Sequence, residues 1–535
     1  MNQRKAWLVV TAFAIIVAII TLVPYLIMDA NTPPGNVFLY TMGNNYDQAS
    51  YQAWIKQAEE GKILAGSNYT TERQSGKFFN PFFVVCGWFV KITGFGMIFA
   101  YQLIRLFFVV VLILVLFKFS ELFLKSFPER FFFVALVSLF SGLSFLFPFK
   151  WLQYLKETYN IGPLDLWVPE ANIFITLLEK PLFMMALILI LITFMLLFKV
   201  FKSPERIKVY SAGFVMFLLG LVHPYDFATI YGTVVLFLLW TKADRKRWVC
   251  FFGVVVLSLP ALIYEYMLSV YDPFLREWGK TLTLSSTIYS YLLGYGFILI
   301  AAAAFTIKKW RKLEKTEIFL LSWVVSHLIL AYMPIRFERR LLLGLSVPLA
   351  LLASLYLFRY LWPYLSKNYV FLKKHSLSTM IIIILITIPS NIRYVVDECI
   401  FFNIFPNNYC LANGDYEAFL WMDKNLKRDT VVFAFYSTGV YMPGLTGCKV
   451  YAGHYDQTLN AERKKKLTGV FYQTNTSDYF RVDLLKNIKA KYLYFGSFEK
   501  NIGDPGFDSK PYLSKVYDKS GVKIYLLKGT ATINY

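Results

Sequence analysis

The sequence has few of the residues from which many soluble active sites are built. It contains 5 cysteines and 4 histidines in 535 residues, and no Cys-x-x-Cys pair indicates a zinc site. The C-terminal region has no glycine-rich dinucleotide fingerprint, no phosphate-binding P-loop and no Ser/His/Asp constellation. Low-complexity segments and clear internal repeats are also absent. These absences argue against a zinc enzyme and against the common soluble nucleotide-binding folds.

Charged residues are scarce, and acidic ones most of all. They make up 17% of the chain, with 34 Asp and Glu against 55 Lys and Arg, so the net charge is +21. The positive charge is spread over many short loops, which disfavours nucleic acid as a partner. We interpret it as partly topogenic and partly available for anionic membrane lipids.

Apolar residues dominate what is present. The chain is 57% hydrophobic and 19% aromatic, with a mean hydropathy of +0.49, values typical of a membrane protein. A membrane-spanning helix needs about 20 mostly apolar residues. By that standard the sequence predicts about eleven spans, of which the fifth, sixth and eleventh are short: 6–28, 98–119, 131–149, 181–201, 209–223, 226–241, 249–267, 287–307, 318–333, 341–361 and 377–389.

Loop charge predicts the orientation. The loops at 118–130, 199–208, 242–247, 308–315 and 359–375 are rich in Lys and Arg, as is the N-terminus with Arg4 and Lys5. The positive-inside rule therefore places the N-terminus in the cytoplasm and the C-terminal region outside. The first apolar run is longer than a signal-peptide core and is not followed by a small-residue cleavage site, so we expect a retained anchor.

The sequence changes character near residue 393. We expect a membrane domain over 1–392, with a first outside loop at 29–97, and an extracytoplasmic α/β domain over 393–535. In the latter, helices at 415–426, 461–467 and 482–488 alternate with strands at 430–435, 449–451 and 491–495, and a hairpin joins 512–517 to 522–527. Cys399, Cys410 and Cys448 fall in this part; a Cys399–Cys410 disulfide is one arrangement, and the odd count leaves one thiol over.

The first outside loop places an acid, Asp47, at the start of a predicted amphipathic helix. Asp47 shares one helix face with Tyr51, Trp54, Ile55 and Ala58. Gly61 is placed to end this helix, and Asn80-Pro81 to begin the next. Asp47 is a candidate general base for an acceptor hydroxyl, with Tyr51 beside it as a candidate substrate contact. The alternative is a helix N-cap, a position that Asp favours.

Three arginines lie in a loop that is predicted to be outside, where the positive-inside rule expects few basic residues. Arg336, Arg339 and Arg340 lie in Pro-Ile-Arg-Phe-Glu-Arg-Arg, which the topology places outside, and Arg336 and Arg340 are i, i+4 neighbours on a helix face. The planar guanidinium suits phosphate oxygens, so we interpret the group as a clamp for a lipid phosphate or diphosphate. The alternative is neutralisation by Glu338 and ordinary headgroup contact.

Two further outside segments carry ionisable groups. The loop between the third and fourth spans contains Glu170, a candidate second catalytic acid, sugar-binding carboxylate or metal ligand, and solvated loop charge is the alternative. His223 and Asp226 lie at a tight turn between two spans and are candidates for substrate contact, while Pro224 explains the turn without any chemistry. His327, inside an apolar span, is expected to be a hydrogen-bonded packing residue.

Taken together, these features resemble the GT-C-type membrane glycosyltransferases, the group that contains protein O-mannosyltransferases, aminoarabinose transferases and oligosaccharyltransferases. The resemblance rests on the first span with its large outside loop and early acid (Tyr46-Asp47-Gln48 through Tyr51), on the multi-span body and on the C-terminal outside α/β domain. The segment from Tyr436 to His454 also resembles uncharacterised bacterial members. The resemblance covers nearly the whole chain, but its motifs are loose.

The resemblance implies inverting transfer of a sugar from a polyprenyl-phosphate donor, at the outer face of a bacterial or archaeal plasma membrane, to a glycan, lipid or protein acceptor. It carries the role of base to Asp47. The chain departs from the metal-dependent branch, because the first two outside loops contain no clear Asp-x-Asp; a divalent metal thus stays an open question. A lipid-linked glycan ligase or polymerase, a transporter or flippase, and a non-catalytic scaffold are the competing hypotheses.

Overall fold

The computed structural model describes residues 2–528, and the chain divides into two compact units. Neither unit is continuous in sequence. The first unit comprises Met1–Leu26, Ile104–Glu265 and Leu282–Ile400. The second comprises Ile27–Leu103, Tyr266–Thr281 and Phe401–Tyr535. The sequence-based division at 392/393 remains a prediction, and the units are described separately.

Long apolar helices dominate the chain. Within residues 2–528, six helical segments are long and apolar enough to cross a membrane, and a bent pair of helices, α19 and α20, passes the same test with a 46° bend. The six are α1 (Gln3–Ala30), α4 (Met97–Ser120), α9 (Pro181–Lys202), α12 (Arg245–Tyr271), α14 with its 3-10 extension (Tyr289–Lys312), and a run over Glu338–Asn368. The bent pair is α19 (Ser376–Ile386) and α20 (Pro389–Ile404). The protein is thus a helical, multi-span membrane protein.

The predicted count of eleven spans is not confirmed, because four of the predicted spans are helices of 13 to 17 residues. The helix α5 shows why. It ends at Leu139, where Phe140 becomes extended with ψ of 153°, well short of the predicted end at residue 149. The four shorter helices are α5 (Phe127–Leu139), α10 (Arg206–Val222), α11 (Asp226–Trp240) and α15 (Lys315–Leu330).

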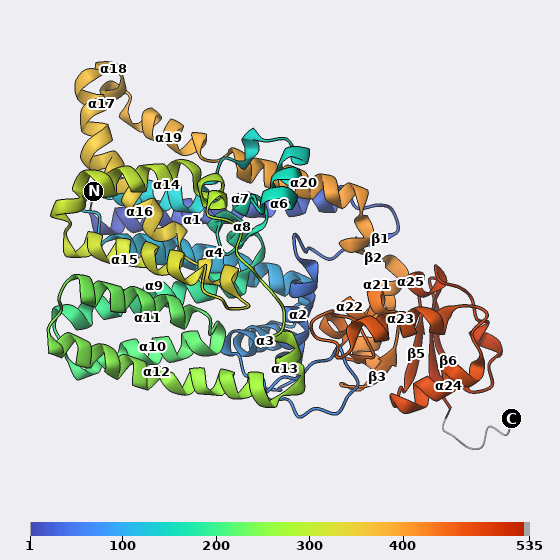
Figure 1. Cartoon of the computed structure of the whole chain (residues 1–535). Helices are drawn as coiled ribbons and strands as arrows, with labels where there is room; N and C mark the ends of the chain where they lie inside the picture. The colour runs from blue at the N-terminus through green and yellow to red at the C-terminus, as the bar shows by residue number, and fades with distance from the viewer. Residues whose placement is uncertain (1, 529–535) are drawn as a thin grey trace. The chain divides into compact units, whose positions relative to one another are not determined.

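In the first unit, α9 packs against α10, and α11 against α15. Figure 1 shows α9, α10, α11 and α12 running roughly parallel to one another. His327 of α15 is fully buried, accepts a hydrogen bond from Trp323 Nε1 at 2.8 Å and donates from Nδ1 to the Leu341 carbonyl. The prediction of a packing histidine is confirmed. The unit also contains the following shorter elements: η1 (Ser144–Leu146), α6 (Phe149–Tyr159), α7 (Leu164–Trp167), α8 (Ile173–Glu179), η2 (Trp310–Lys312), η3 (Glu338–Leu342), α16 (Ser346–Tyr356), η4 (Leu357–Leu361), α17 (Trp362–Asn368) and α18 (Val370–Lys374).

In the second unit, the first outside loop supplies α2 (Asn45–Glu59) and α3 (Pro81–Thr93). The helix α3 starts at the predicted Asn80-Pro81, where the Asn80 side chain accepts from the Phe82 N–H. Gly61 follows the end of α2 with φ of 96°, as expected for a stop signal. The prediction of a one-sided amphipathic α2 is wrong, because residues 48–58 are buried all round the helix. The cause is packing on two sides, against α3 and against α22 (Tyr436–Thr446).

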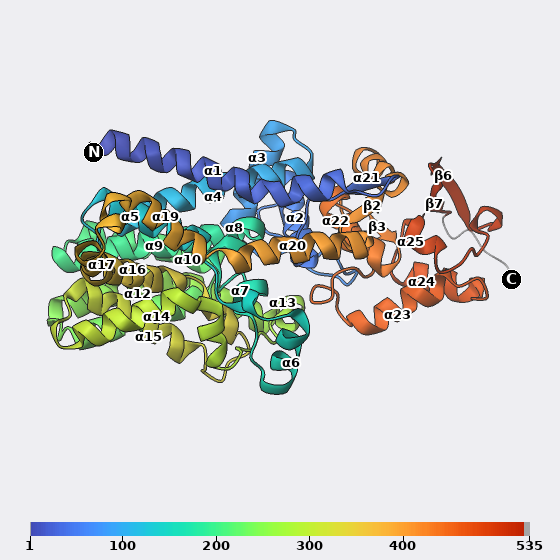
Figure 2. The same ribbon diagram turned by 90° about the horizontal axis from the view of Figure 1, so that it is seen from above.

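The C-terminal part of this unit is a five-stranded mixed sheet in the order β4-β3-β5-β7-β6. The strand β3 pairs in parallel with β4 and β5, and the antiparallel hairpin β6–β7 completes the sheet; Figure 2 shows β6 beside β7. A second, two-stranded sheet joins β1 to β2. The strands are β1 (Asn36–Phe38), β2 (Cys410–Ala412), β3 (Val431–Phe433), β4 (Lys449–Val450), β5 (Tyr492–Phe495), β6 (Leu513–Lys519) and β7 (Val522–Leu527).

Every strand predicted for the α/β region is present, and so are its three predicted helices. The turn of the hairpin is Ser520-Gly521, both with positive φ, which matches the twist of paired strands. All five cysteines are free, so Cys399 and Cys410 form no disulfide. The remaining elements of this unit are α13 (Pro273–Trp278), η5 (Pro406–Asn408), α21 (Asn413–Asn425), α23 (Ala461–Tyr472), α24 (Asp478–Asn487), α25 (Ser497–Lys500) and η6 (Phe507–Ser509).

Candidate functional site

Asp47 lies in the first turn of α2 and is half-buried. The helix N-cap is Asn44, whose side chain accepts a hydrogen bond from the Asp47 N–H at 3.3 Å. The alternative interpretation of Asp47 as the N-cap is therefore wrong, and Asn44 has that role. A carboxylate one turn into a helix is stabilised by the partial positive charge of the helix N-terminus. Asp47 is thus placed where an ionised acid is favoured.

The negative charge of Asp47 acts on a residue that the sequence analysis did not single out, His454. Its imidazole is 4% exposed and contacts two tyrosine rings, Tyr46 at 6.2 Å and Tyr69 at 5.6 Å between centroids. The Asp456 backbone N–H donates to its Nδ1 at 3.2 Å. A ring nitrogen that accepts carries no proton, so the neutral ring has its proton on Nε2.

Two nearby carboxylates partly oppose the effect of burial on the pKa of His454. Burial lowers the pKa of His454 below its ordinary value of 6.5, while the negative charges of Asp47 and Asp456 and the backbone of Tyr46 partly oppose this. Nε2 is buried and forms no hydrogen bond of ordinary geometry with residues 2–528. The ring is therefore neutral at pH 7, with its Nε2–H near the start of α2.

The loop that carries His454 is held by several hydrogen bonds. The Gly453 N–H donates to Thr458 Oγ1, and that hydroxyl donates to the Tyr69 carbonyl at 2.9 Å. Ser67 Oγ donates to the Gln457 carbonyl at 2.8 Å. These bonds tie the turn after β4 to the first outside loop within the same unit. The only hint of this in the sequence is the rarity of histidine, with 4 in the chain.

Tyr51, the predicted substrate contact, is 7% exposed. Its ring packs on Phe83 of α3 at 5.4 Å and on Trp54 at 6.3 Å. Its ring thus belongs to the contact of α2 with α3, and a role toward substrate remains a proposal.

In the first unit, Arg340 and the His223–Asp226 pair converge on Tyr225. Arg340 donates to the Tyr225 hydroxyl at 2.6 Å and its guanidinium lies 4.9 Å from the Tyr225 ring centre. The His223 ring lies 5.2 Å from the same ring. His223 Nδ1 and Asp226 Oδ2 are 2.9 Å apart, and both residues are buried. The structure therefore joins two groups that the sequence analysis treated separately.

Arg339 lies on a different aromatic ring. Its guanidinium is 4.8 Å from the ring centre of Trp167, which also has the Lys156 ammonium 4.2 Å away. Its Nε is buried and has no hydrogen-bond partner among residues 2–528. Trp167 therefore holds two cations beside the loop that contains Glu170.

The predicted helical face of Arg336 and Arg340 is absent. Residues 338–342 form the 3-10 helix η3, and Arg336 precedes it in a turn with an exposed side chain. The cause is the backbone pairing of the loop: Thr283 donates to the Arg336 carbonyl at 2.8 Å, and Arg339 donates to the Thr283 carbonyl at 2.9 Å. Glu338 accepts the Ser285 N–H at 2.9 Å.

Glu170 follows α7 and is 6% exposed, so it is not a solvated loop charge. Its Oε2 is buried without a hydrogen-bond partner among the described residues. Its negative charge acts on Tyr295 of α14. Its role as a second catalytic acid remains a proposal. Among residues 2–528, no group of three or more His, Cys, Asp or Glu side chains is arranged to hold a metal ion.

Comparison with known proteins gives a clear structural likeness. No protein-family model and no curated protein sequence matches the chain. The apo oligosaccharyltransferase of Archaeoglobus fulgidus matches with a TM-score of 0.55 and 13% identity over 98% of this chain and 75% of that one. ArnT from Cupriavidus metallidurans, solved with undecaprenyl phosphate bound, matches with a TM-score of 0.53 and 11% identity over 99% of both chains.

A third solved structure agrees. The arabinofuranosyltransferase AftD from Mycobacteria matches with a TM-score of 0.53 and 13% identity over 98% of this chain and 42% of that one. All three are GT-C glycosyltransferases. At these identities the likeness establishes the fold, and the chain accordingly has the fold of the GT-C glycosyltransferases.

Proposed function

We propose that the protein is an integral membrane glycosyltransferase that moves a sugar from a polyprenyl-phosphate donor to an acceptor on the extracytoplasmic face. The observation that carries the proposal is an acid in the first turn of α2, beside a buried neutral histidine, in a chain with a GT-C fold. The N-terminus is cytoplasmic in this proposal, and the α/β region is outside. The acceptor is a glycan, a lipid or a protein.

The proposed reaction is an in-line displacement at the anomeric carbon. Asp47 removes the proton of the acceptor hydroxyl, and the acceptor oxygen forms the new bond to the anomeric carbon. The bond from that carbon to the phosphate oxygen breaks, and its electron pair leaves on the phosphate. Arg336, Arg339 and Arg340 stabilise the charge that develops there. Glu170, His223 and Asp226 are further candidates for donor contact.

Aromatic rings support the arginine assignment. Arg339 and Arg340 each lie over a ring, and a guanidinium fixed over an aromatic face is a better-defined phosphate ligand than a mobile lysine. Trp167 and Tyr225 would thus preorganise the clamp.

In this proposal His454 is a positioning residue for Asp47. It acts through Asp47 and does not touch the reacting atoms. Because its Nδ1 is engaged by the Asp456 N–H, it presents a fixed Nε2–H dipole near the start of α2. Such a dipole would help to orient the carboxylate.

The test uses purified full-length protein in nanodiscs with a panel of polyprenyl-phosphate sugars. Donor binding, donor hydrolysis and transfer are measured for wild type, Asp47→Asn and the double variant Arg336→Ala/Arg340→Ala. We expect Asp47→Asn to bind donor normally and to lose transfer by a factor of about 100 or more, the usual contribution of a general base. The arginine variant should bind donor more weakly.

Asn44→Ser is the matched control at the start of α2, because serine also caps helices and leaves Asp47 in place. Normal transfer by Asp47→Asn at normal abundance would refute the base assignment. A lipid-linked glycan ligase or polymerase would instead use only oligosaccharide donors in the same panel. Absence of donor binding by wild type would favour the transporter or scaffold hypothesis.

A further inference from the structure

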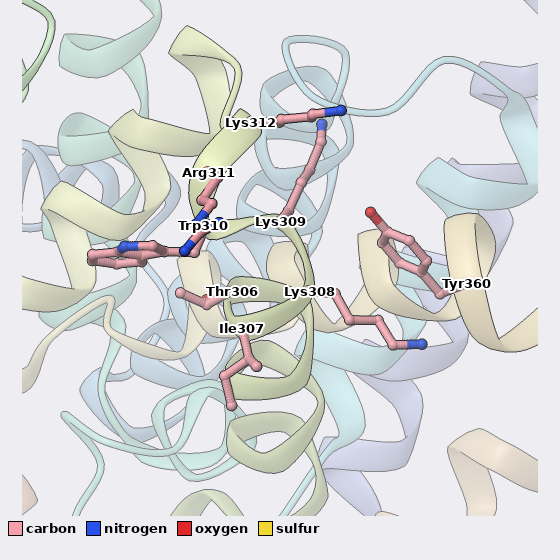
Figure 3. A pocket seen from close by; sticks show the side chains of 8 residues that line it. All are labelled: Thr306, Ile307, Lys308, Lys309, Trp310, Arg311, Lys312 and Tyr360. Atoms are coloured by element: carbon pink, nitrogen blue, oxygen red, sulfur yellow. The ribbon is translucent and has the colours of Figure 1, made fainter.

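The C-terminal end of α14 forms a basic pocket that glycosyl transfer does not use. The helix continues into η2, and residues 308–312 read Lys-Lys-Trp-Arg-Lys. A cavity of about 830 Å³ is lined by this segment, by Thr306 and Ile307, and by Tyr360 of η4. Figure 3 shows Lys308 on the side of α14 that faces Tyr360 and Trp310 on the opposite side. By its loop charge this end of α14 is predicted to be cytoplasmic.

Three cations of this pocket have no acidic partner. Lys309 is paired with Glu314 at 3.1 Å and Glu317 at 2.6 Å, and Arg359 also pairs with Glu317. The two acids are therefore balanced by two bases. In the described chain Lys308, Arg311 and Lys312 form no ion pair and are exposed, so about three positive charges remain available to an anion.

Lys308 is nevertheless held in place. Its ammonium lies 5.2 Å from the ring centre of Tyr360 and 5.6 Å from that of Tyr356. Both rings come from one short stretch, since Leu357–Leu361 forms a π-helical turn directly after α16. π-helical turns occur frequently at functional sites. The turn thus places two tyrosines under one lysine.

A second, apolar cavity is also lined in part by α14 and η4. It measures about 390 Å³ and opens between α5, α14, α16, η4 and α19. Small side chains, Ala301, Ala304 and Ala353, leave this space. Tyr356 lines the apolar cavity, and its ring centre lies 5.6 Å from the Lys308 ammonium, so this cation of the basic pocket lies beside a wall of the apolar cavity.

Trp310 marks the depth at which the basic pocket lies. It is 61% exposed and packs against Trp240 of α11 at 5.9 Å between ring centres. Exposed tryptophans are typical of the headgroup level of a bilayer. A cation cluster at that level, next to an apolar cavity, suits an amphiphile with a phosphate head and a hydrocarbon tail.

We propose that this is a binding site for an anionic phospholipid of the bilayer, with its phosphate at Lys308 and an acyl chain in the apolar cavity that Tyr356 lines. Arg311 and Lys312 add positive charge around this end of the helix. The site is independent of the proposed glycosyl transfer. The site differs from the ordinary excess of basic residues in cytoplasmic loops because its cations lie near a cavity that can hold a hydrocarbon chain.

The experiment measures lipid retention by native mass spectrometry of delipidated full-length protein. Dioleoyl phosphatidylglycerol is the probe, and dioleoyl phosphatidylcholine is its neutral counterpart. The test variant is Lys308→Gln/Arg311→Gln/Lys312→Gln. The matched control, Lys367→Gln/Lys373→Gln/Lys374→Gln, removes three exposed charges from α17 and α18. A third variant, Ala304→Phe, fills the apolar cavity and leaves the charge unchanged.

We expect wild type to retain phosphatidylglycerol at least tenfold more than phosphatidylcholine. The test variant and Ala304→Phe should each lose that preference, and the control should keep it. Equal losses in test and control variants would overturn the proposal, because the attraction would then be general. Full competition by inorganic phosphate would reduce the site to a bare anion site, and preferential retention of undecaprenyl phosphate would assign it to the polyprenyl carrier instead; both results contradict a phospholipid site.

Discussion

The Asp456 backbone N–H donates to Nδ1 of His454 at 3.2 Å and so leaves the neutral imidazole with its proton on Nε2. This bond decides what His454 can do for Asp47. A neutral ring that accepts at Nδ1 and carries its proton on Nε2 has no free basic nitrogen. It is a fixed dipole, and substitutions can separate that role from simple space filling.

His454→Ala should lower kcat of transfer about tenfold with little change in KM for the donor, because one preorganised dipole near the base is worth about 1–2 kcal/mol. His454→Gln should recover most of the rate, since its amide N–H reaches the position of Nε2–H. Steady-state kinetics on both variants checks this. His375→Ala, at an exposed position, is the control, and wild-type kcat in His454→Ala would contradict the positioning role.

Acid should destabilise the second unit through His454. Burial lowers its folded pKa below 6.5, so the unfolded chain takes up the proton first as the pH falls. The stabilising effect of the neutral ring is complete above pH 6.5 and is lost as the pH falls through the lower, folded pKa. Thermal unfolding between pH 7.5 and 5 should show a smaller drop in Tm for His454→Gln than for wild type. Identical slopes would show that His454 does not titrate in this range.

The close packing of Gly439 against the His454 loop predicts a stability effect. A Cβ at Gly439 of α22 would lie 2.1 Å from the Ala452 carbonyl oxygen, so Gly439→Ala must displace backbone. We expect a loss of about 1–3 kcal/mol, the usual cost of overpacking, together with lower transfer activity. Thermal unfolding of purified protein measures it.

Gly469→Ala is the matched control. Gly469 lies inside α23, and a Cβ there would meet nothing within 4 Å. Alanine should stabilise this helix by about 0.5–1 kcal/mol. If both alanines had the same effect, the close approach at Gly439 would not be what limits stability.

The substitution Arg339→Lys tests the arginine clamp, because it keeps the positive charge and removes the planar guanidinium. Arg339→Lys preserves the charge but loses the planar contact with Trp167, 4.8 Å away. We expect KM for the donor to rise roughly tenfold, equivalent to about 1.4 kcal/mol. Kinetics at two ionic strengths checks it, with Lys156→Gln as the control on the same ring. An unchanged KM in Arg339→Lys would remove Arg339 from the clamp.

The local elements could be read from the sequence because their signals are local. Asn80-Pro81 begins α3, and Ser520-Gly521 turns the final hairpin. Each is decided by residues within a few positions, so no tertiary information was needed. The predicted span count is not confirmed, since hydropathy cannot show that α5 stops at Leu139, where Phe140 becomes extended.

The candidate site was only partly predictable. Asp47 stands out in the sequence because a carboxylate follows a long apolar run. His454 lies about 400 positions further on and meets α2 only through tertiary packing, so no spacing rule connects them. Arg340 and His223 were recognised separately, and their shared contact, Tyr225, is a side chain that is ordinary in sequence. Helical spacing also misled the assignment at Arg336, where loop pairing with Thr283 prevails.

The two-stranded sheet of β1 and β2 has a consequence for biogenesis. It pairs Val37 with Leu411, so the segment that leads to Asp47 finds its partner only after more than 370 further residues have been made. Such distant pairing is slow and must await synthesis of the later strand. During membrane insertion, β1 in the first outside loop therefore has no partner strand until β2 has been made. A ribosome-bound chain shorter than about 410 residues should lack a fixed position for Asp47. The proposed glycosyl transfer would thus become possible only late in translation, after the last apolar helices have been inserted.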